Sequence, residues 1–169
     1  MSKNLVVCLI ALIACGLVTS CAAPKKKPVV EPEIVSTDEP DIRTGVWEAI
    51  AQIKPVYFEY NKSTLRSDAQ STLKNHAIYF KEHADLEILV EGHCDERGTI
   101  EYNMSLGQRR ANAVRNYLSK LGVSLGNIST ISYGEEQPAD FGHTESAWSK
   151  NRRAELKVRS VAEQAEEAE

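Results

Sequence analysis

The sequence predicts an α/β domain, a two-layer sandwich in which helices pack on a small mixed four-stranded sheet. Short apolar runs of strand length alternate with longer segments whose apolar residues recur at helical spacing. The last run, 154–158, alternates between apolar and charged residues, which is typical of a half-buried strand. The length of 169 residues suits one domain with appendages. The expected order is β-α-β-α-β-(α)-β, and it leaves the order of the strands in the sheet open.

Each element has its own signal. A short helix over 45–53 precedes a strand over 55–60 that places Val56, Phe58 and Tyr60 on one face. Ser67 and Gln70 have the form of a capping box and start the first long helix. A strand over 86–91 follows, and then a helix over 103–121 with a second possible capping box at Ser105 and Gln108 and a stop at Gly122. The last elements are a strand over 128–133, a short helix from Thr144 to Trp148, and a strand ending at Val158.

The first 20 residues have the pattern of a signal peptide. Lys3 precedes an apolar run from Leu5 to Leu17, which is too short to span a bilayer comfortably. The residues that follow, Val-Thr-Ser-Cys ending at Cys21, resemble a bacterial lipobox, in which the cysteine is acylated after cleavage. An ordinary signal peptide with an incidental cysteine is the alternative. Because Ala22 and not Asp follows the cysteine, the resemblance implies an outer-membrane anchor.

The rest of the chain divides into a tether, a domain and a tail. Residues 21–44 hold the lipidated cysteine and a proline-rich segment of mixed charge without periodicity, which we expect to be a flexible tether or a simple spacer. Residues 45–159 form the folded domain, and 160–169 form an acidic tail. The net charge of −4, with both signs interspersed, gives no reason to expect nucleic acid as a partner. Three of the four cysteines lie at or before Cys21, so no disulfide framework is expected.

The segment from Gly92 to Ala111 carries the unusual charge. On helical spacing, Arg110 falls inside an apolar stripe, whereas Arg109 falls on its flank. A buried ion is very costly without a partner, and Asp95 supplies the obvious one, either as a salt-bridge partner of Arg110 or as a co-ligand. The segment therefore predicts a site for a small group that carries both signs of charge. Arg152 shares the inward parity of the last strand and is the second suspect buried charge.

The motifs of the domain resemble a known family. They read VYFEYNKS from Val56, GHCDERGT from Gly92, EYN from Glu101, LGQRRA from Leu106, SYGEE from Ser132 and NRRA from Asn151. Over about 52–158 they are similar to the OmpA-like peptidoglycan-binding domain. With the lipobox and the proline-rich tether they resemble the group of that family called peptidoglycan-associated lipoproteins. Glu59, Tyr60 and Asn61 depart from residues common in the family, and Asn61 puts an ionic role of that position in doubt.

The resemblance implies a function and a set of site residues. The ligand would be the meso-diaminopimelate end of the peptidoglycan stem peptide, bound by Asp95, Arg110, Asn103, Arg97 and Asn61, with Arg152 as a supporting or purely structural residue. The domain would link the outer membrane to the cell wall within the Tol-Pal system, which serves envelope integrity and constriction at cell division. Its protein partner would be a TolB-type periplasmic β-propeller, contacted through Glu96, Thr99 and Tyr102. No cofactor is implied.

Other functions remain as alternatives. One is a generic OmpA-like wall tether without a Tol partner, and another is a cell-wall hydrolase. The hydrolase is disfavoured because Asp95 and Glu96 are adjacent and Cys94 has no signature base. Zinc is not expected either, since the consecutive residues His93, Cys94 and Asp95 seldom converge on one ion. The remaining histidines are scattered, and His76 and His83 are expected to face solvent.

Overall fold

The computed structural model describes residues 46–160. The signal peptide, Cys21, the tether and the last nine residues of the acidic tail lie outside the described residues, so the predictions made for them are not addressed by the fold. No helix within 46–160 is both long and apolar enough to cross a membrane.

A mixed four-stranded sheet forms one layer of the fold, as predicted. Its strands are β1 (Val56–Tyr57), β2 (Leu86–His93), β3 (Ile128–Gly134) and β4 (Arg153–Ser160), in the order β1-β4-β2-β3. β2 and β3 are parallel, while β4 is antiparallel to both β1 and β2. The last strand therefore inserts between the first two, a topology that sequence patterning leaves open.

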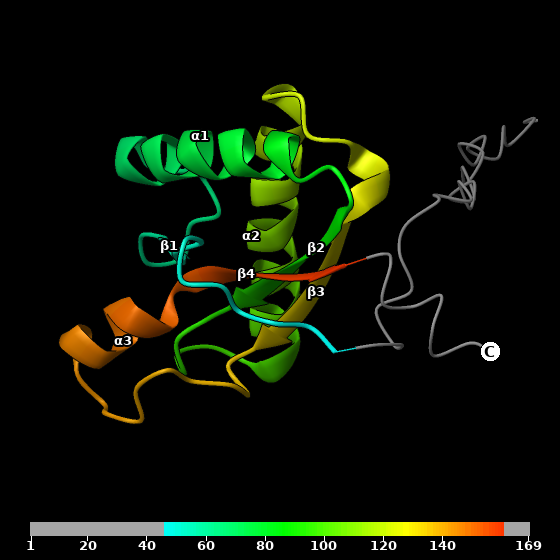
Figure 1. Cartoon of the computed structure of the whole chain (residues 1–169). Helices are drawn as coiled ribbons and strands as arrows, with labels where there is room; N and C mark the ends of the chain where they lie inside the picture. The colour runs from blue at the N-terminus through cyan, green and yellow to red at the C-terminus, as the bar shows by residue number, and fades with distance from the viewer. Residues whose placement is uncertain (1–45, 161–169) are drawn as a thin grey trace, which may run out of the picture. The chain divides into compact units, whose positions relative to one another are not determined.

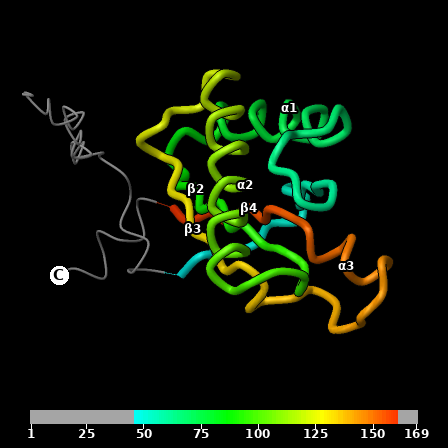
Figure 2. Tube along the Cα trace, turned by 180° about the vertical axis from the view of Figure 1, so that it is seen from behind, coloured from blue at the N-terminus to red at the C-terminus, as the bar shows by residue number. Residues whose placement is uncertain are grey.

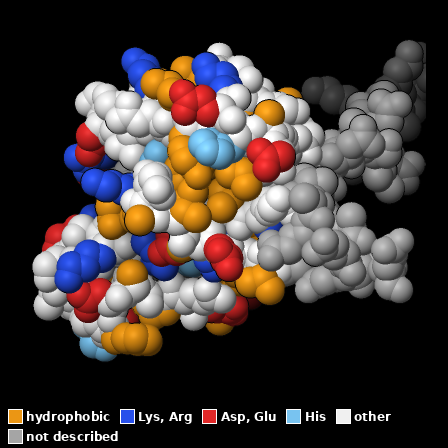
Figure 3. Space-filling view, viewed as in Figure 1, with side chains coloured by type: hydrophobic (Ala, Val, Ile, Leu, Met, Phe, Trp, Pro, Cys, Tyr) orange, Lys and Arg blue, Asp and Glu red, His pale blue; other side chains and the backbone are white. Residues whose placement is uncertain are grey.

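Helices cover one face of this sheet. α2 (Ile100–Lys120) lies along the sheet and α1 (Ser67–Glu82) crosses it near one end, while α3 (Glu145–Asn151) lies apart beside β1, as two opposite views show (Figures 1 and 2). A short 3-10 turn, η1 (Leu125–Asn127), precedes β3. The fully buried core includes Leu73, Ile88, Val90, Val114, Leu118 and Ile128. On the face of Figure 3, hydrophobic side chains gather between α1 and β4, and charges of both signs surround them.

Several local predictions are wrong, each for a structural reason. Residues 46–53 form no helix; Glu48 instead pairs with Val158 as an isolated bridge at the sheet. The first strand is only two residues long, because the chain leaves the sheet after Tyr57, and Tyr60 is exposed rather than inward. Neither capping box forms: Arg66 precedes α1 without a side-chain cap, and Thr99 caps α2. The cap at Thr144 and the stop at Gly122 are confirmed.

His76 is also not where the sequence predicted. It is 3% exposed, and its Nε2 accepts a hydrogen bond from the main-chain N–H of Lys54 at 3.1 Å. Burial lowers its pKa to about 4, because a charged imidazole would lose its hydration there. His76 is therefore a neutral core residue that ties the segment before β1 to α1.

The contact between β2 and α2 depends on two glycines. A Cβ on Gly92 would lie 2.0 Å from the carbonyl oxygen of Gly107, and a Cβ on Gly107 would lie 2.8 Å from that of Gly92. No larger residue fits on either side of this contact without moving the backbone. The contact brings the end of β2 directly against α2 and fixes the position of the loop that follows His93.

Candidate functional site

A small polar pocket of about 90 Å³ lies where β2 ends and α2 begins. Three segments line it: the loop after β1, the loop between β2 and α2, and the first turns of α2. Its lining residues are Tyr60, Asn61, Cys94, Asp95, Arg97, Gly98, Tyr102, Asn103, Leu106 and Arg110. The pocket therefore gathers all five residues expected to bind a ligand.

Asp95 is the buried anion of this pocket. It is 4% exposed, and its Oδ2 accepts from Arg97 at 2.6 Å and from Arg152 at 3.2 Å. Burial alone would raise the pKa of the carboxyl group, but the hydrogen bonds from the two arginines outweigh it and hold the pKa below its usual value. Asp95 is accordingly ionised at neutral pH and oriented from two sides.

Arg97 forms the partly exposed wall of the pocket. Its guanidinium lies between two aromatic rings, 4.0 Å from the centroid of Tyr60 and 4.1 Å from that of Trp148. It also pairs with Glu145 at 3.5 Å, and its side chain is 28% exposed. The hydrogen bond to Asp95 raises the pKa of Arg97, so its charge is secure. The stacking holds the guanidinium over the carboxylate while leaving one side open to solvent.

Arg110 is fully buried, as its place in the apolar stripe predicts, but its partners are not the expected ones. Its Nη1 donates to the carbonyl oxygen of His93 at 2.7 Å, its Nε to that of Lys62 at 2.9 Å, and its Nη2 to that of Glu59 at 3.2 Å. The direct salt bridge to Asp95 is therefore absent among the described contacts. Arg110 instead ties the loop after β1 to the end of β2, and its charge has no neutralising carboxylate in direct contact.

Two asparagines complete the pocket. The side-chain amide of Asn103 is buried and donates to the carbonyl oxygens of Asp95 and Arg97, at 3.2 and 3.3 Å, and to Glu135. Asn61 has a φ of +54°, the left-handed region that asparagine tolerates better than most residues, and accepts a hydrogen bond from the hydroxyl of Tyr102. Asn103 thus shapes the loop, and Asn61 closes the rim.

Of the residues expected to contact a protein partner, Tyr102 lines the pocket, and Glu96 and Thr99 lie in the loop between β2 and α2. Glu96 is exposed and accepts from Trp148 Nε1 at 2.9 Å and pairs with His143 at 2.7 Å. Thr99 accepts from the N–H of Tyr102 at 3.2 Å and so caps α2. Tyr102 is 43% exposed. All three residues are exposed, and Glu96 also contacts α3 through Trp148.

Cys94 is a buried free thiol at the floor of the pocket. Its Sγ donates to the carbonyl oxygen of Asn103 at 3.3 Å, and burial raises its pKa to about 11. A thiol with so high a pKa is protonated at neutral pH and is a poor nucleophile. Cys94 packs in this site rather than supplying chemistry.

Comparison with known proteins identifies the family of the domain. The pattern of the OmpA family matches residues 57–152, more than half of the chain and all of the pocket. The chain belongs to the OmpA family.

Within the OmpA family, two curated relatives show how far the similarity reaches. The peptidoglycan-associated lipoprotein of Pasteurella multocida is 52% identical over 101 residues, which cover 60% of this chain and 67% of the relative. That of Pseudomonas aeruginosa is 48% identical over 109 residues, covering 64% of each chain. The match thus spans about two thirds of the length of these relatives.

Solved structures carry the same fold. The crystal structure of the peptidoglycan-associated lipoprotein from Burkholderia pseudomallei has a TM-score of 0.61 and 45% identity, covering 62% of this chain and 89% of that chain. The C-terminal domain of Helicobacter pylori MotB also has a TM-score of 0.61, with 23% identity, covering 68% of this chain and 91% of that chain. The second likeness concerns the fold alone.

Some parts of this OmpA-family pocket were not predicted from the sequence. Tyr60 was expected to point into the core, and Trp148 and Glu145 were expected only as parts of a short helix, yet all three contact Arg97. Arg152, left between two roles, donates to Asp95 and to the carbonyl oxygen of Phe58 at 3.2 Å each. For Tyr60, the sequence offered one signal of a place at the pocket: it is adjacent to Asn61 in the first motif.

Proposed function

We propose that the protein is an outer-membrane-anchored lipoprotein that binds peptidoglycan non-covalently through the meso-diaminopimelate of the stem peptide. In this role it links the outer membrane to the cell wall within a Tol-Pal system. The observation that carries the proposal is that one small pocket holds both an ionised, buried Asp95 and a buried Arg110 that has no carboxylate in direct contact. The peptidoglycan-associated lipoproteins among its relatives support the same function.

The free end of diaminopimelate is a zwitterion, with an ammonium and a carboxylate on one carbon. An ionised carboxylate offers about four lone-pair sites; the Oδ2 of Asp95 already accepts from Arg97 and Arg152, and its Oδ1 accepts from the main-chain N–H of Arg97 at 3.3 Å. An incoming ammonium would use the remaining site on Oδ1 or replace the side chain of Arg97, which is the partly exposed partner. Of the charged residues that line the pocket, two arginines, Arg97 and Arg110, face one carboxylate, Asp95, and this excess of positive charge favours the ligand carboxylate.

Arg110 would act mainly through its charge and through its hydrogen bonds to the backbone. Its Nε and one N–H on each terminal nitrogen already donate to main-chain carbonyls, so the guanidinium does not offer a free pair of N–H groups for a bidentate bond to the ligand. The start of α2 adds partial positive charge on the same side. The ligand carboxylate would therefore be attracted by positive charge that is already in position, and Arg110 would keep its hydrogen bonds to the backbone.

The direct test compares two stem peptides by calorimetric titration. One carries diaminopimelate at its third position, and the other carries lysine, which has the ammonium but lacks the adjacent carboxylate. We expect the lysine peptide to bind at least tenfold more weakly, about 1.4 kcal/mol, because the positive pocket loses its anionic partner. Equal affinity for both peptides would contradict the proposed ligand.

Variants assign the pocket residues. Asp95→Asn keeps the shape and an acceptor but removes the charge, and it should reduce sedimentation with purified sacculi by more than tenfold. Asp85→Asn, at an exposed acid just before β2, is the matched control. Arg110→Gln should cost about 2–5 kcal/mol of binding. Arg110 also donates hydrogen bonds to main-chain carbonyls, so Arg110→Gln could lose binding through lost stability. The thermal unfolding of this variant is therefore measured as well, with a substitution at an exposed residue, Arg109→Gln, as the control.

The partner surface distinguishes this role from that of a generic wall tether. A TolB-type β-propeller is proposed to dock over Glu96, Thr99 and Tyr102, next to the pocket. A pull-down with the propeller, competed by the diaminopimelate peptide, tests it. Capture that the peptide reduces supports the Tol-Pal role; peptidoglycan binding without any capture supports the generic tether.

A cell-wall hydrolase fits the site poorly. General acid catalysis needs a carboxyl group whose pKa is raised, whereas hydrogen bonds from Arg97 and Arg152 lower that of Asp95 against the effect of burial. The carboxyl group of Glu96 is exposed and engaged by His143 and Trp148. Release of soluble fragments from purified sacculi would overturn the binding-only role.

A further inference from the structure

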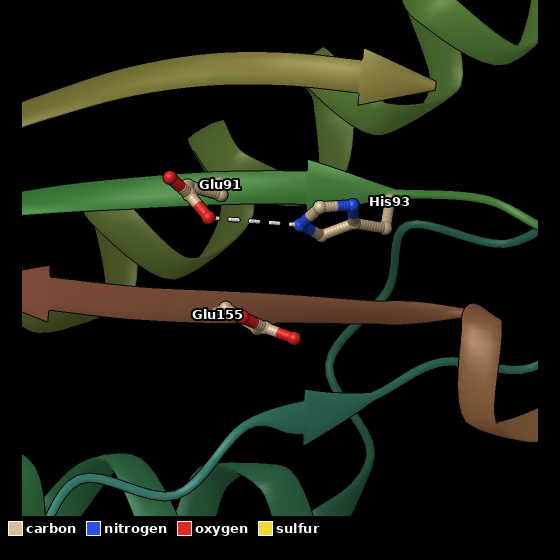
Figure 4. A group of neighbouring side chains, drawn as sticks. All are labelled: Glu91, His93 and Glu155. Carbon is tan, nitrogen blue, oxygen red and sulfur yellow. Dashed lines mark ion pairs between the residues drawn. The ribbon is translucent and has the colours of Figure 1, made fainter. Parts of the chain in front are cut away.

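The sheet face opposite the helices carries a second polar cluster, away from the pocket. Glu91 and His93 are two residues apart on β2 and so share one face, and Glu155 on β4 stands directly opposite Glu91 in the register. Figure 4 shows the two side chains along β2 with Glu155 on the neighbouring strand. One ligand atom from each residue lies within 4.8 Å of the other two.

His93 shows that this cluster is not a finished hydrogen-bond network. It is 1% exposed, stacks on Tyr133 at 5.6 Å, and neither ring nitrogen has a hydrogen-bond partner in the described structure. Its Nε2 lies 3.9 Å from Oε2 of Glu91, too far for a hydrogen bond but close to the spacing of two ligands on one ion. A buried polar atom left without a partner costs free energy, so the ring nitrogen is available to a cation.

Cationic side chains contact one oxygen of each carboxylate and leave the other oxygen for an ion. Lys157 contacts Oε1 of Glu91 at 3.0 Å, and Arg153 donates to Oε1 of Glu155 at 2.5 Å. Two acids directly opposite one another on antiparallel strands repel, and these flanking cations offset that repulsion. The second oxygens, with Nε2 of His93, remain for a shared ion.

We propose that Glu91, His93 and Glu155 form a divalent-cation site with a preference for zinc, separate from the peptidoglycan pocket. One imidazole and two carboxylates are ligands that zinc accepts, with bonds of about 2.0–2.2 Å. Tetrahedral bonds of that length place ligands about 3.4 Å apart, so small side-chain movements close the site. The side chain of Glu155 is 33% exposed and gives the ion a way in. The sequence does not indicate this cluster, because Glu155 comes next to Glu91 only through the pairing of β4 with β2.

The test titrates the full chain with zinc, and with cobalt as a visible reporter of tetrahedral coordination. Wild type should bind one ion at this site and show a higher unfolding temperature with zinc. Glu155→Gln should weaken binding at least tenfold, and His93→Gln should do the same. Because zinc also binds thiolates, the readout is the difference between wild type and Glu155→Gln rather than the total bound.

Two further variants make the result decisive. His143→Gln removes an exposed histidine that pairs with Glu96 and should leave the zinc affinity unchanged. Lys157→Gln removes the ammonium that competes for Glu91 and should tighten binding. If His93→Gln fails to fold by circular dichroism, Glu155→Gln, at a partly exposed position, carries the test. Equal zinc affinity in wild type and Glu155→Gln, or loss only in His143→Gln, would overturn the proposal.

Discussion

His76 couples the stability of the domain to pH at the scale of one residue. Burial lowers its pKa to about 4, from an ordinary value of 6.5. Between these values the unfolded chain binds a proton that the folded chain excludes, so stability is fully present above 6.5 and falls as the pH drops toward 4. The loss attributable to this one residue is about 3 kcal/mol.

His76→Gln tests this coupling, since glutamine keeps an acceptor for the N–H of Lys54 but does not titrate. Urea unfolding near neutral pH and near pH 4 should show a smaller acid loss in the variant, by about 2–3 kcal/mol. The exposed His83→Gln serves as the control and should follow wild type. An acid loss in His76→Gln as large as that of wild type would assign the effect to other groups.

The charges of the pocket show what a sequence can predict about single residues. The burial of Arg110 followed from its position in an apolar helical stripe. Its partners did not, because they are main-chain carbonyls of Glu59, Lys62 and His93, and a main-chain oxygen has no signature in the sequence. Of the two arginines that engage Asp95, Arg152 reaches it only because β4 inserts beside β2, and patterning along the chain does not encode that insertion.

At the scale of elements, the site depends on how closely α2 approaches β2. Gly92→Ala would place a Cβ, held rigidly by the backbone of β2, 2.0 Å from the main-chain carbonyl oxygen of Gly107 in α2. No side-chain rotation relieves such a contact, so we expect destabilisation of about 3 kcal/mol, at the upper end of overpacking effects. Denaturant unfolding measures it. Gly126→Ala, in the exposed turn before β3 where φ is not positive, is the matched control and should change stability little.

The ends of the elements were harder to predict than their existence. Ser67 and Ser105 matched a capping pattern, yet α2 begins earlier, at Ile100, where Thr99 accepts the hydrogen bond of Tyr102. Several polar residues near a helix start satisfy the pattern, and tertiary packing selects among them. The segment 46–53 has helix-forming residues, but pairing of Glu48 with β4 outweighs that weak preference. The α/β class was predictable because it rests on whole periods rather than on single ends.

At the scale of the whole molecule, the proposed function needs two parts, a membrane anchor and a site that binds the cell wall. The proposed wall-binding site is the pocket of the described domain, and the proposed anchor is Cys21, which lies outside the described residues. If the two act independently, each can be removed without the other. Envelope linkage then requires both in one chain, as expected for a protein that joins two surfaces rather than one that catalyses a reaction.

Replacing residues 1–21 by a cleavable signal peptide without a lipobox tests this separation. The resulting chain should move from the membrane fraction to the soluble periplasmic fraction, because a domain without acyl chains has nothing to partition into the bilayer. It should still sediment with purified sacculi as wild type does. Asp95→Asn in the lipidated chain should show the opposite pattern, staying with membranes and losing sacculi. Loss of sacculus binding in the unlipidated chain would mean that wall binding depends on the lipid anchor, and the proposed independence of the two parts would be wrong.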